Sequence, residues 1–424
     1  MWVARKEAYV SGFPTRPQAV AEILGRINDL QRADKDWRHG RLFSAQYHDD
    51  RELETVIEAA VATSFWLNAL SSEGFPSLAT MEAEVVGYGA DLLGFPDGTG
   101  IMTSGGSESI FQAVKVARDE ARQTKPQIKS PEVVLPASAH PAWTKMSQYL
   151  GVQTIRVPVD EAHKADVEAI AEACTANTIL IVGSAMAWPH GVVDPIAALG
   201  KLASDRGVRL HVDACVGGFV LPFARRLGRE VPAFDLSVPG VSSISADLHK
   251  FGYAPKGASL VLFRDPKSLD FQRFDFDDWT GGHYTTLTFS GSRPGGPIAA
   301  AWAAIRYLAE PGYLRMTKSC LDAADAFRSA IEQVGDFRVV GEPKYNLFAF
   351  ASPTLNAALV NKGMADRGWL IGAQGKPASS LHLMLTPLHV NREQEFASDL
   401  RETVASIGRG EVQLSEDDEV ARYN

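Results

Sequence analysis

The sequence predicts an α/β fold built on a mostly parallel sheet, because strand-length apolar runs alternate with helix-like segments through the middle of the chain. Six short runs rich in β-branched residues lack helical periodicity and are expected strands: 132–136, 154–159, 178–184, 209–214, 242–247 and 258–263. Between them, segment 107–123 places Ile110, Val114 and Ala117 on one helical face, and 194–207 is also helix-like. Ligands of such sheets bind beyond the carboxyl ends of the strands, where we expect the functional site.

The order of elements predicts four segments. We expect an N-terminal arm and helical segment over 1–59, a large domain over 60–310, a small C-terminal α+β domain over 311–410 and an acidic, disordered tail over 411–424. The boundary near 310 follows a long alanine-rich helical pattern.

Composition excludes several classes of protein. The 424 residues are 45% hydrophobic and 22% charged, which is typical of a globular chain and not of a disordered or fibrous one. A formal net charge of -9 without a stripe of Lys and Arg argues against a nucleic-acid partner. The start of the chain lacks the apolar core of a signal peptide, and the longest uncharged stretch, 173–193, contains Pro189 and Gly191 and is interpreted as strand plus loop.

The three cysteines, Cys174, Cys215 and Cys320, are odd in number and widely spaced. They fit neither a disulfide framework nor paired metal ligands. We therefore expect a cytoplasmic protein without a membrane span.

Four motifs carry residues suited to chemistry: TSGGSES (103–109), SAHPAW (138–143), HVDACVGGF (211–219) and SADLHKFGYAPKG (245–257). The first places two glycines and several hydroxyl groups before a helix, where backbone N–H groups and the helix dipole favour a phosphate. The alternative is a plain tight turn at Gly105 and Gly106.

In the third motif, period-two geometry sends His211 and Asp213 to the same face of a strand, with Asp213 nearer its carboxyl end. A buried carboxylate there needs a cationic partner. Asp213 is either part of a structural ion pair or cap, or the counter-charge of a protonated ring nitrogen. A metal site is not expected, because no third ligand stands at a suitable spacing.

Lys250 follows a strand-like segment, inside a run whose glycines and proline must pack tightly. A lysine in a dry pocket loses its proton more readily and can form a Schiff base, although most lysines are solvated surface charges. The four motifs become coherent if one ligand carries a phosphate, a basic ring nitrogen, an aromatic face and an aldehyde. Pyridoxal 5'-phosphate meets all four requirements.

These motifs, together with SGSRPGG (290–296), resemble the sphingosine-1-phosphate lyase family, in the group II decarboxylase-like branch of the fold-type-I pyridoxal enzymes. The resemblance covers residues 43–407. It implies a fold-type-I architecture and a homodimer with shared active sites. The eukaryotic lyases carry a transmembrane helix that this chain lacks, so a soluble bacterial-type form is implied.

The resemblance also implies residue roles. Lys250 would carry the cofactor, Asp213 would pair with its ring nitrogen, and His140 would stack on its ring. Its phosphate would be held by residues of two subunits: Gly106, Ser107 and His249, with Gly291 and Ser292 from the neighbour. Tyr47 matches a family tyrosine that reaches the partner's site, and Lys256 matches a lysine that faces the substrate; with Lys250 they would handle protons.

The chain departs from the family at the residues that would recognise substrate. Asn68 is retained, but Ser71 stands where the family has a histidine that helps to bind the substrate's phosphate. Trp188 stands where an aromatic residue, often smaller, is expected. The implied function is retro-aldol cleavage of a long-chain base phosphate into a fatty aldehyde and phosphoethanolamine.

Two alternatives stay open. An amino-acid decarboxylase on the same scaffold would use the same cofactor, although the stretch 379–389 offers His382 and His389 in place of the arginine that usually binds the substrate carboxylate. A protein that binds a ligand without turnover is the other, and the presence of Lys250, Asp213 and His140 argues against it.

Overall fold

The computed structural model describes residues 12–43, 46–374 and 379–414. The described residues up to His39 form one compact unit, which contains α1 (Val20–Gln31) and the short 3₁₀ helix η2 (Trp37–His39). The residues from Gly40 onward form the other unit, and every predicted site residue lies in it. Of the predicted acidic tail, residues 415–424 lie outside the described residues.

The centre of the second unit is a sheet in the order β1-β8-β7-β6-β4-β2-β3, with the short β5 beside β4. Its strands are β1 (Thr99–Thr103), β2 (Glu132–Pro136), β3 (Gln153–Val157), β4 (Thr178–Ala187), β5 (Val192–Val193), β6 (Arg209–Asp213), β7 (Val241–Ala246) and β8 (Ser259–Phe263). Strands β3, β2, β4, β6 and β7 pair in parallel, whereas β8 runs antiparallel between β7 and β1. The six predicted strands are confirmed, and the sheet is mostly parallel as expected.

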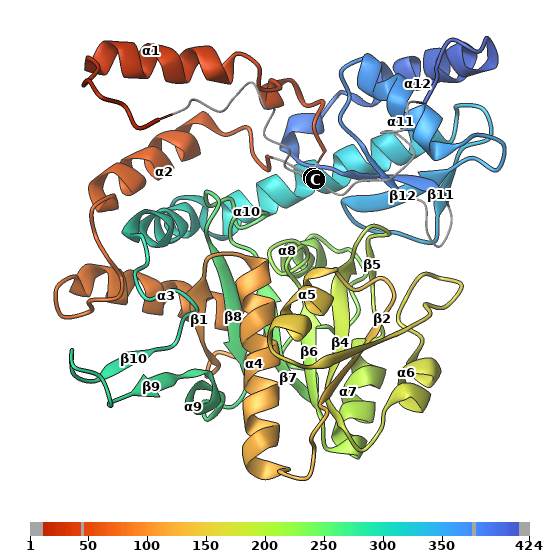
Figure 1. Cartoon of the computed structure of the whole chain (residues 1–424). Helices are drawn as coiled ribbons and strands as arrows, with labels where there is room; N and C mark the ends of the chain where they lie inside the picture. Colours follow the sequence, from red (N-terminus) through yellow and green to blue (C-terminus); the bar gives the residue numbers. More distant parts are fainter. Residues whose placement is uncertain (1–11, 44–45, 375–378, 415–424) are drawn as a thin grey trace. The chain divides into compact units, whose positions relative to one another are not determined.

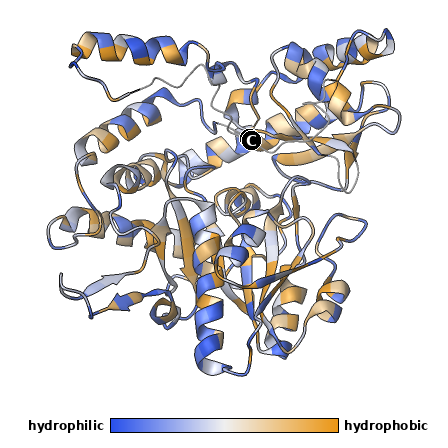
Figure 2. Cartoon of the chain, in the orientation of Figure 1, coloured by the Kyte–Doolittle hydropathy of each residue, from blue (hydrophilic) through white to orange (hydrophobic). Residues whose placement is uncertain are grey.

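Helices pack around this sheet, as its buried central strands require. They are α2 (Arg51–Ser64), α3 (Pro76–Leu92), α4 (Gly106–Thr124), α5 (Ala142–Tyr149), α6 (Val167–Ala173), α7 (Ile196–Arg206), α8 (Leu221–Arg226), α9 (Ser268–Gln272) and the first part of α10 (Gly295–Ile331). Helices α3 to α7 contact the strands directly, whereas α2 packs on α10 and α9 packs on α4. In Figure 1, α4 crosses one face of the sheet. Its predicted apolar face, Ile110, Val114 and Ala117, is buried in one core cluster with residues of β2 and β4. Figure 2 shows the central strands coloured mainly as hydrophobic.

The C-terminal part packs α10 against a smaller antiparallel sheet in the order β11-β12-β14-β13. Its elements are β11 (Arg338–Val340), β12 (Leu347–Ala351), α11 (Ala357–Asp366), β13 (Gly372–Gln374), β14 (Ser380–Met384), η3 (Pro387–His389) and α12 (Glu393–Gly408). Phe327, Phe350 and Phe396 belong to a second core there. The predicted boundary near 310 falls inside α10, next to a break in helical geometry at Ala309.

A hairpin, β9 (Phe274–Phe276) and β10 (Tyr284–Thr286), precedes α10. None of the helices in the described ranges combines the length and the apolar character that crossing a bilayer requires.

Candidate active site

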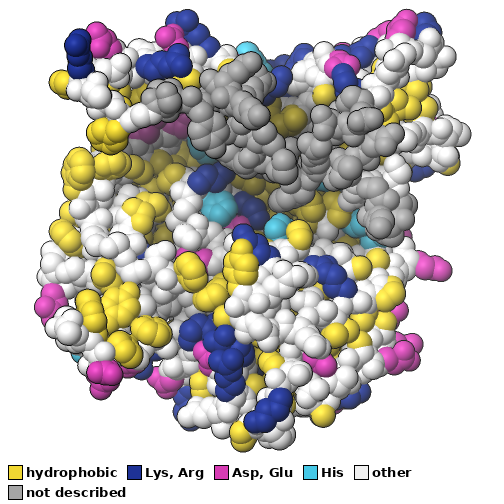
Figure 3. All heavy atoms as spheres, viewed as in Figure 1, with side chains coloured by type: hydrophobic (Ala, Val, Ile, Leu, Met, Phe, Trp, Pro, Cys, Tyr) yellow, Lys and Arg dark blue, Asp and Glu magenta, His cyan; other side chains and the backbone are white. Residues whose placement is uncertain are grey.

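A cavity of about 410 Å³ lies at the carboxyl ends of β4, β6 and β7 and at the N-terminus of α4. Eight predicted site residues line it: Tyr47, Gly106, Ser107, His140, Trp188, Asp213, His249 and Lys250. Figure 3 shows a hollow near the centre of this face in which histidine and Lys or Arg side chains gather. The structure therefore brings residues that are more than 200 positions apart in the sequence to one site, at the edge of the sheet where ligands are expected.

Asp213 ends β6 and is 7% exposed. Its Oδ2 accepts a hydrogen bond from the Trp143 indole N–H at 3.0 Å, and its Oδ1 accepts one from the Cys215 backbone N–H at 3.2 Å. Within the described ranges, no Lys, Arg or His forms an ion pair with this carboxylate. Because a buried carboxylate needs a positive partner, the site fits a ligand that brings its own cationic nitrogen.

His211, two residues earlier on the same strand, is satisfied by the protein. Its Nδ1 and Nε2 lie 2.8 Å and 3.1 Å from the hydroxyls of Ser243 and Ser245. Burial lowers the pKa of its imidazole to about 4, so the ring is neutral. His211 is therefore part of the core that supports Asp213.

Lys250 pairs with Asp247, not with Asp213. The Lys250 Nζ lies 2.7 Å from Oδ2 of Asp247, which is 2% exposed and follows β7 directly. Burial alone would lower the pKa of the Lys250 ammonium, but the Asp247 carboxylate overrides this effect and the pKa is raised. The expectation that a dry pocket lowers the pKa of Lys250 is thus wrong for the protein alone, because a buried counter-ion stands beside the amine.

The turn between β1 and the start of α4, residues 104–107, forms a narrow cup, the glycine cup. Gly105 has a φ of 153°, a conformation that glycine tolerates best. A Cβ at Gly106 would lie 2.9 Å from both Asp247 Oδ1 and Cys215 Sγ. Glu108 fixes the turn, because its carboxylate accepts hydrogen bonds from the backbone N–H and the hydroxyl of Ser104 at 2.8 Å and 2.6 Å.

This cup fits an anionic group. It lies at the N-terminus of a 19-residue helix, where unpaired N–H groups and the helix dipole attract negative charge. His249 lies against Gly105, and its buried Nδ1 has no hydrogen-bond partner among the described residues. The site therefore fits pyridoxal 5'-phosphate. The cup offers a place for its phosphate, Asp213 offers a counter-charge for its ring nitrogen, and Lys250 offers an amine for its aldehyde.

Substituting Gly106 with alanine tests the cup. The new Cβ would collide with Asp247 and Cys215, so we expect pyridoxal phosphate to bind at least about tenfold more weakly, a loss of about 1.4 kcal/mol. Equilibrium titration of the visible absorption of the bound cofactor measures the change. Gly87→Ala in α3, where nothing lies within 4 Å of the added Cβ, is the matched control. Unchanged affinity in Gly106→Ala would contradict the assignment.

His140 and Lys256 occupy other parts of the site. The His140 Nδ1 accepts a hydrogen bond from the Ala142 N–H at 3.1 Å, and burial lowers the pKa of its ring. The Lys256 Nζ lies 4.6 Å from the centroid of the Tyr47 ring and donates to the His249 carbonyl at 3.3 Å. Lys256 as a residue remains accessible to solvent, yet burial of its ammonium group and the nearby charge of Lys250 lower its pKa to about 8.

A second cavity, of about 300 Å³, adjoins the first and shares Tyr47, His249 and Lys250 with it. Lys256 lines this second cavity. Tyr47 thus lines both cavities of its own chain, and its expected reach into a partner's active site stays a prediction.

Asn68, Ser71, Gly291 and Ser292 do not line either cavity. They lie on two neighbouring loops, where the Asn68 side-chain amide donates to the Ser292 hydroxyl at 3.2 Å and its carbonyl oxygen accepts from the Arg293 N–H at 3.1 Å. The Ser71 hydroxyl accepts from the Gly74 N–H in the same region. The expectation that Gly291 and Ser292 complete a neighbouring subunit's site stays a prediction, as do the substrate contacts expected of Asn68 and Ser71.

Sequence reasoning missed Asp247, Trp143 and the residues that wall the cavity. The signal for Asp247 was its place three residues before Lys250 in SADLHK. The two late histidines differ in role: the His382 ring packs edge-on against Trp188, with centroids 4.7 Å apart, whereas His389 is buried in the second core and hydrogen-bonds the Leu42 carbonyl.

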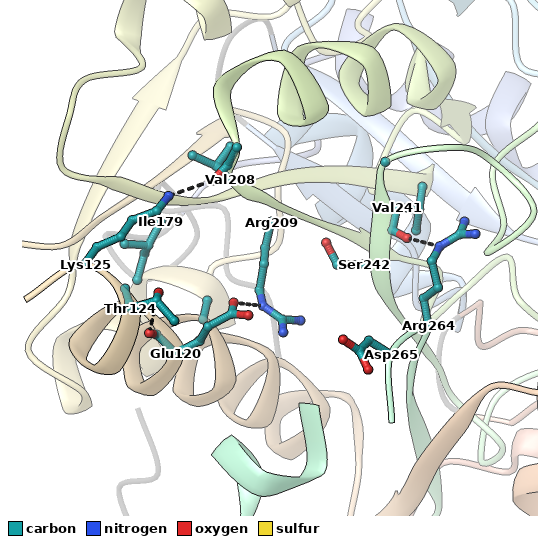
Figure 4. A pocket seen from close by; sticks show the side chains of 14 residues that line it. Glu120, Thr124, Lys125, Ile179, Val208, Arg209, Val241, Ser242, Arg264 and Asp265 are labelled. Carbon is teal, nitrogen blue, oxygen red and sulfur yellow. Dashed lines mark hydrogen bonds and ion pairs between the residues drawn. The ribbon is translucent and has the colours of Figure 1, made fainter. Parts of the chain in front are cut away.

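Another cavity, of about 360 Å³, lies at the opposite end of the sheet, before β6 and β7 and after β8. Figure 4 shows that its basic side chains already have partners within the protein. Arg209 forms an ion pair with Glu120, Lys125 donates a hydrogen bond to the Gly207 carbonyl, and Arg264 donates one to the Val241 carbonyl. No predicted site residue lines it, and no cluster suited to a metal ion occurs within the described ranges.

Comparisons with known proteins agree with this chemistry. The model of the pyridoxal-dependent decarboxylase conserved domain matches residues 6–352. The sphingosine-1-phosphate lyase of Arabidopsis thaliana is 41% identical over 395 residues, which cover 91% of this chain and 72% of that protein. The L-aspartate/L-glutamate decarboxylase of Pyrococcus horikoshii is 34% identical, over 93% of this chain and 100% of that protein. Among solved structures, the sphingosine-1-phosphate lyase of Burkholderia pseudomallei superposes with a TM-score of 0.89 at 35% identity, over 95% of each chain.

Proposed function

The chain belongs to the pyridoxal-dependent decarboxylase family, and we propose that within it the protein acts as a carbon–carbon lyase on a long-chain base phosphate of the sphingosine-1-phosphate type. The products would be a fatty aldehyde and phosphoethanolamine. The observation that carries the proposal is the cavity in which Lys250, Asp213, His140 and the glycine cup converge.

Each of these residues has a task toward pyridoxal 5'-phosphate. Gly106, Ser107 and His249 would hold the phosphate, Asp213 would keep the ring nitrogen protonated, His140 would lie against the ring, and Lys250 would carry the aldehyde. The bound cofactor supplies an electron-withdrawing ring that weakens a bond to the substrate's Cα. The protein supplies orientation and the groups that move protons.

The lining of the cavity favours the lyase over a decarboxylase. No arginine lines it within the described ranges, and its lining includes five apolar residues: Ile110, Met186, Trp188, Val216 and Met384. Apolar side chains suit an alkyl chain, whereas a carboxylate substrate calls for a cation with paired donors. Decarboxylation of an acidic amino acid stays the second candidate, because the Pyrococcus horikoshii enzyme is 34% identical to this chain.

Lys256 is our proposed proton acceptor for the substrate hydroxyl, with Tyr47 beside it. A lysine serves as a base only when neutral, and its pKa of about 8 makes a large share neutral slightly above physiological pH. We expect kcat/KM to reach half of its maximum near pH 8 and to level off about one pH unit higher.

The variant Lys256→Arg keeps the positive charge but cannot lose its proton, so we expect kcat to fall by about a hundredfold or more and the rise near pH 8 to disappear. Lys201→Arg, an exposed lysine paired with Asp205, is the matched control. A pH profile that Lys256→Arg leaves unchanged would assign the proton transfer to another group.

Three further properties are proposed with this function. The protein would be a homodimer in which Gly291 and Ser292 complete the neighbouring subunit's phosphate site, and Asn68, Ser71 and Trp188 would contact the substrate. The segments 1–59, 60–310, 311–410 and 411–424 stay its predicted divisions. A cytoplasmic location is supported by the three cysteines, which are all buried and free.

Product analysis tests the function. The purified protein, loaded with pyridoxal phosphate, is incubated with sphingosine-1-phosphate and, separately, with a panel of amino acids that includes aspartate and glutamate. The proposal predicts a long-chain aldehyde and phosphoethanolamine in equal amounts from the first substrate. Carbon dioxide from an amino acid, without aldehyde from the lipid, would instead establish the decarboxylase.

A further inference from the structure

Asp247 is the counter-ion of the amine on which the proposed chemistry depends. It follows β7 by one residue, is 2% exposed, and its Oδ2 lies 2.7 Å from the Lys250 Nζ. The same oxygen lies 3.6 Å from the His249 Nε2. Although burial opposes ionisation, the charges of Lys250 and His249 keep the pKa of Asp247 below its usual value, so the carboxylate is charged.

No other group around Lys250 acts as the counter-ion of its ammonium among the described residues. The titratable groups that act on Lys250 or line the larger cavity come from five segments: Tyr47, Glu108, His140, Asp213, Cys215, Asp247, His249 and Lys256. Three of them are carboxylates. Those of Glu108 and Asp213 accept hydrogen bonds from other groups, and within the described ranges neither makes an ion pair with Lys250. The thiol of Cys215 has a pKa raised by burial and is neutral. Asp247 is therefore the one carboxylate in the described cavity that holds the ammonium.

We propose that Asp247 is a positioning residue that holds Lys250 as an ammonium ion beside the glycine cup and thereby controls how readily the amine combines with the cofactor's aldehyde. This inference rests on the proposed link between Lys250 and pyridoxal phosphate. Asp247 touches the amine and acts through it. The same contact gives the lysine a defined place whenever it is not bound to the cofactor.

The physical reason lies in the proton. An ammonium nitrogen has no free electron pair, so it must first release its proton to solvent; its lone pair then adds to the aldehyde carbon, the C–N double bond forms and the aldehyde oxygen leaves as water. A carboxylate at 2.7 Å stabilises the ammonium and makes this first step rarer at neutral pH. Removing the carboxylate's charge has the opposite effect.

Asp247 also lies against the cup, since its Oδ1 would be 2.9 Å from a Cβ at Gly106 and has no hydrogen-bond partner among the described residues. Its negative charge opposes an anion there, so neutralising it should also favour phosphate binding. Affinity alone would therefore not separate the two effects, whereas the pH dependence of attachment does.

The experiment measures how fast pyridoxal phosphate becomes attached to the cofactor-stripped full-length protein. The visible absorption of the linked cofactor reports the rate, followed between about pH 6 and pH 9 in wild type and Asp247→Asn. In wild type, we expect the rate to rise about tenfold for each pH unit, because the neutral amine is scarce throughout this range. In Asp247→Asn, we expect a rate at least about tenfold higher near pH 7 and a plateau within the range.

Asp235→Asn is the matched control, since Asp235 is also buried but pairs with Arg225 away from the cavity. It should show the wild-type pH dependence. The inference would be overturned if the attachment rate of Asp247→Asn depended on pH as the wild-type rate does. It would also be overturned if the wild-type rate did not depend on pH, and this second test does not require a variant that folds. Wild-type protein that gains no visible absorption at any pH would instead refute the proposed cofactor link itself.

Discussion

Lys250→Ala is expected to abolish the visible absorption of linked pyridoxal phosphate and to lower kcat by about four orders of magnitude or more. Lys250 is the only lysine that lines the larger cavity within the described residues, and its amine lies 2.7 Å from the carboxylate of Asp247. Alanine has no nitrogen to combine with an aldehyde. Spectroscopy and a kinetic assay of the same preparation measure both effects.

The control for Lys250→Ala is Lys201→Ala, which removes an exposed lysine that pairs with Asp205. This variant should retain both the absorption and the activity. If Lys250→Ala kept its visible absorption, another amine would carry the cofactor, and the assignment of the cavity would be wrong.

Asp213→Asn should have the second largest effect, a fall in kcat of about a hundredfold or more. The amide has nearly the shape of the carboxylate, so the site stays packed against Trp143, but it cannot stabilise a positive ring nitrogen. The electron-withdrawing power of the cofactor would then be lost while the cofactor remains attached to Lys250. Measured kcat should therefore fall more than cofactor content.

Asp194→Asn provides the comparison. Asp194 is also buried, and its carboxylate accepts hydrogen bonds from the backbone N–H groups of Ser184 and Ala165 at 2.6 Å and 2.8 Å. We expect this variant to change thermal stability more than kcat. Equal losses of kcat in the two variants would indicate that Asp213 acts only through packing.

The strands and the convergence of motifs could be predicted because they depend on local pattern. The run 178–184 is entirely apolar or small and becomes part of β4, whose ten residues are all buried. Asp213 ends one parallel strand and Lys250 follows another, and the carboxyl ends of such strands share one edge of the sheet. Sequence order and strand direction thus suffice to bring these two residues to the same site.

The remaining features depend on contacts between distant segments. The reversed direction of β8 depends on the path of residues 247–258, which form no helix, and the strand pattern alone does not reveal that path. The pairing of Lys250 with Asp247 depends on the conformation of the intervening turn, and the place of Tyr47 beside Lys256 depends on the path of the N-terminal segment. Similarly, His382 and His389 look equivalent in sequence, but one supports Trp188 and the other lies in the second core.

Mapping the cofactor attachment site tests the central claim most directly. Protein loaded with pyridoxal phosphate is treated with borohydride, which fixes the carbon–nitrogen link, and is then digested and analysed by mass spectrometry. The account predicts one pyridoxyl group per chain, on Lys250 in the peptide that contains HKFGYAPK. Stoichiometric labelling of Lys256 or of any other lysine, with Lys250 unmodified, would contradict it.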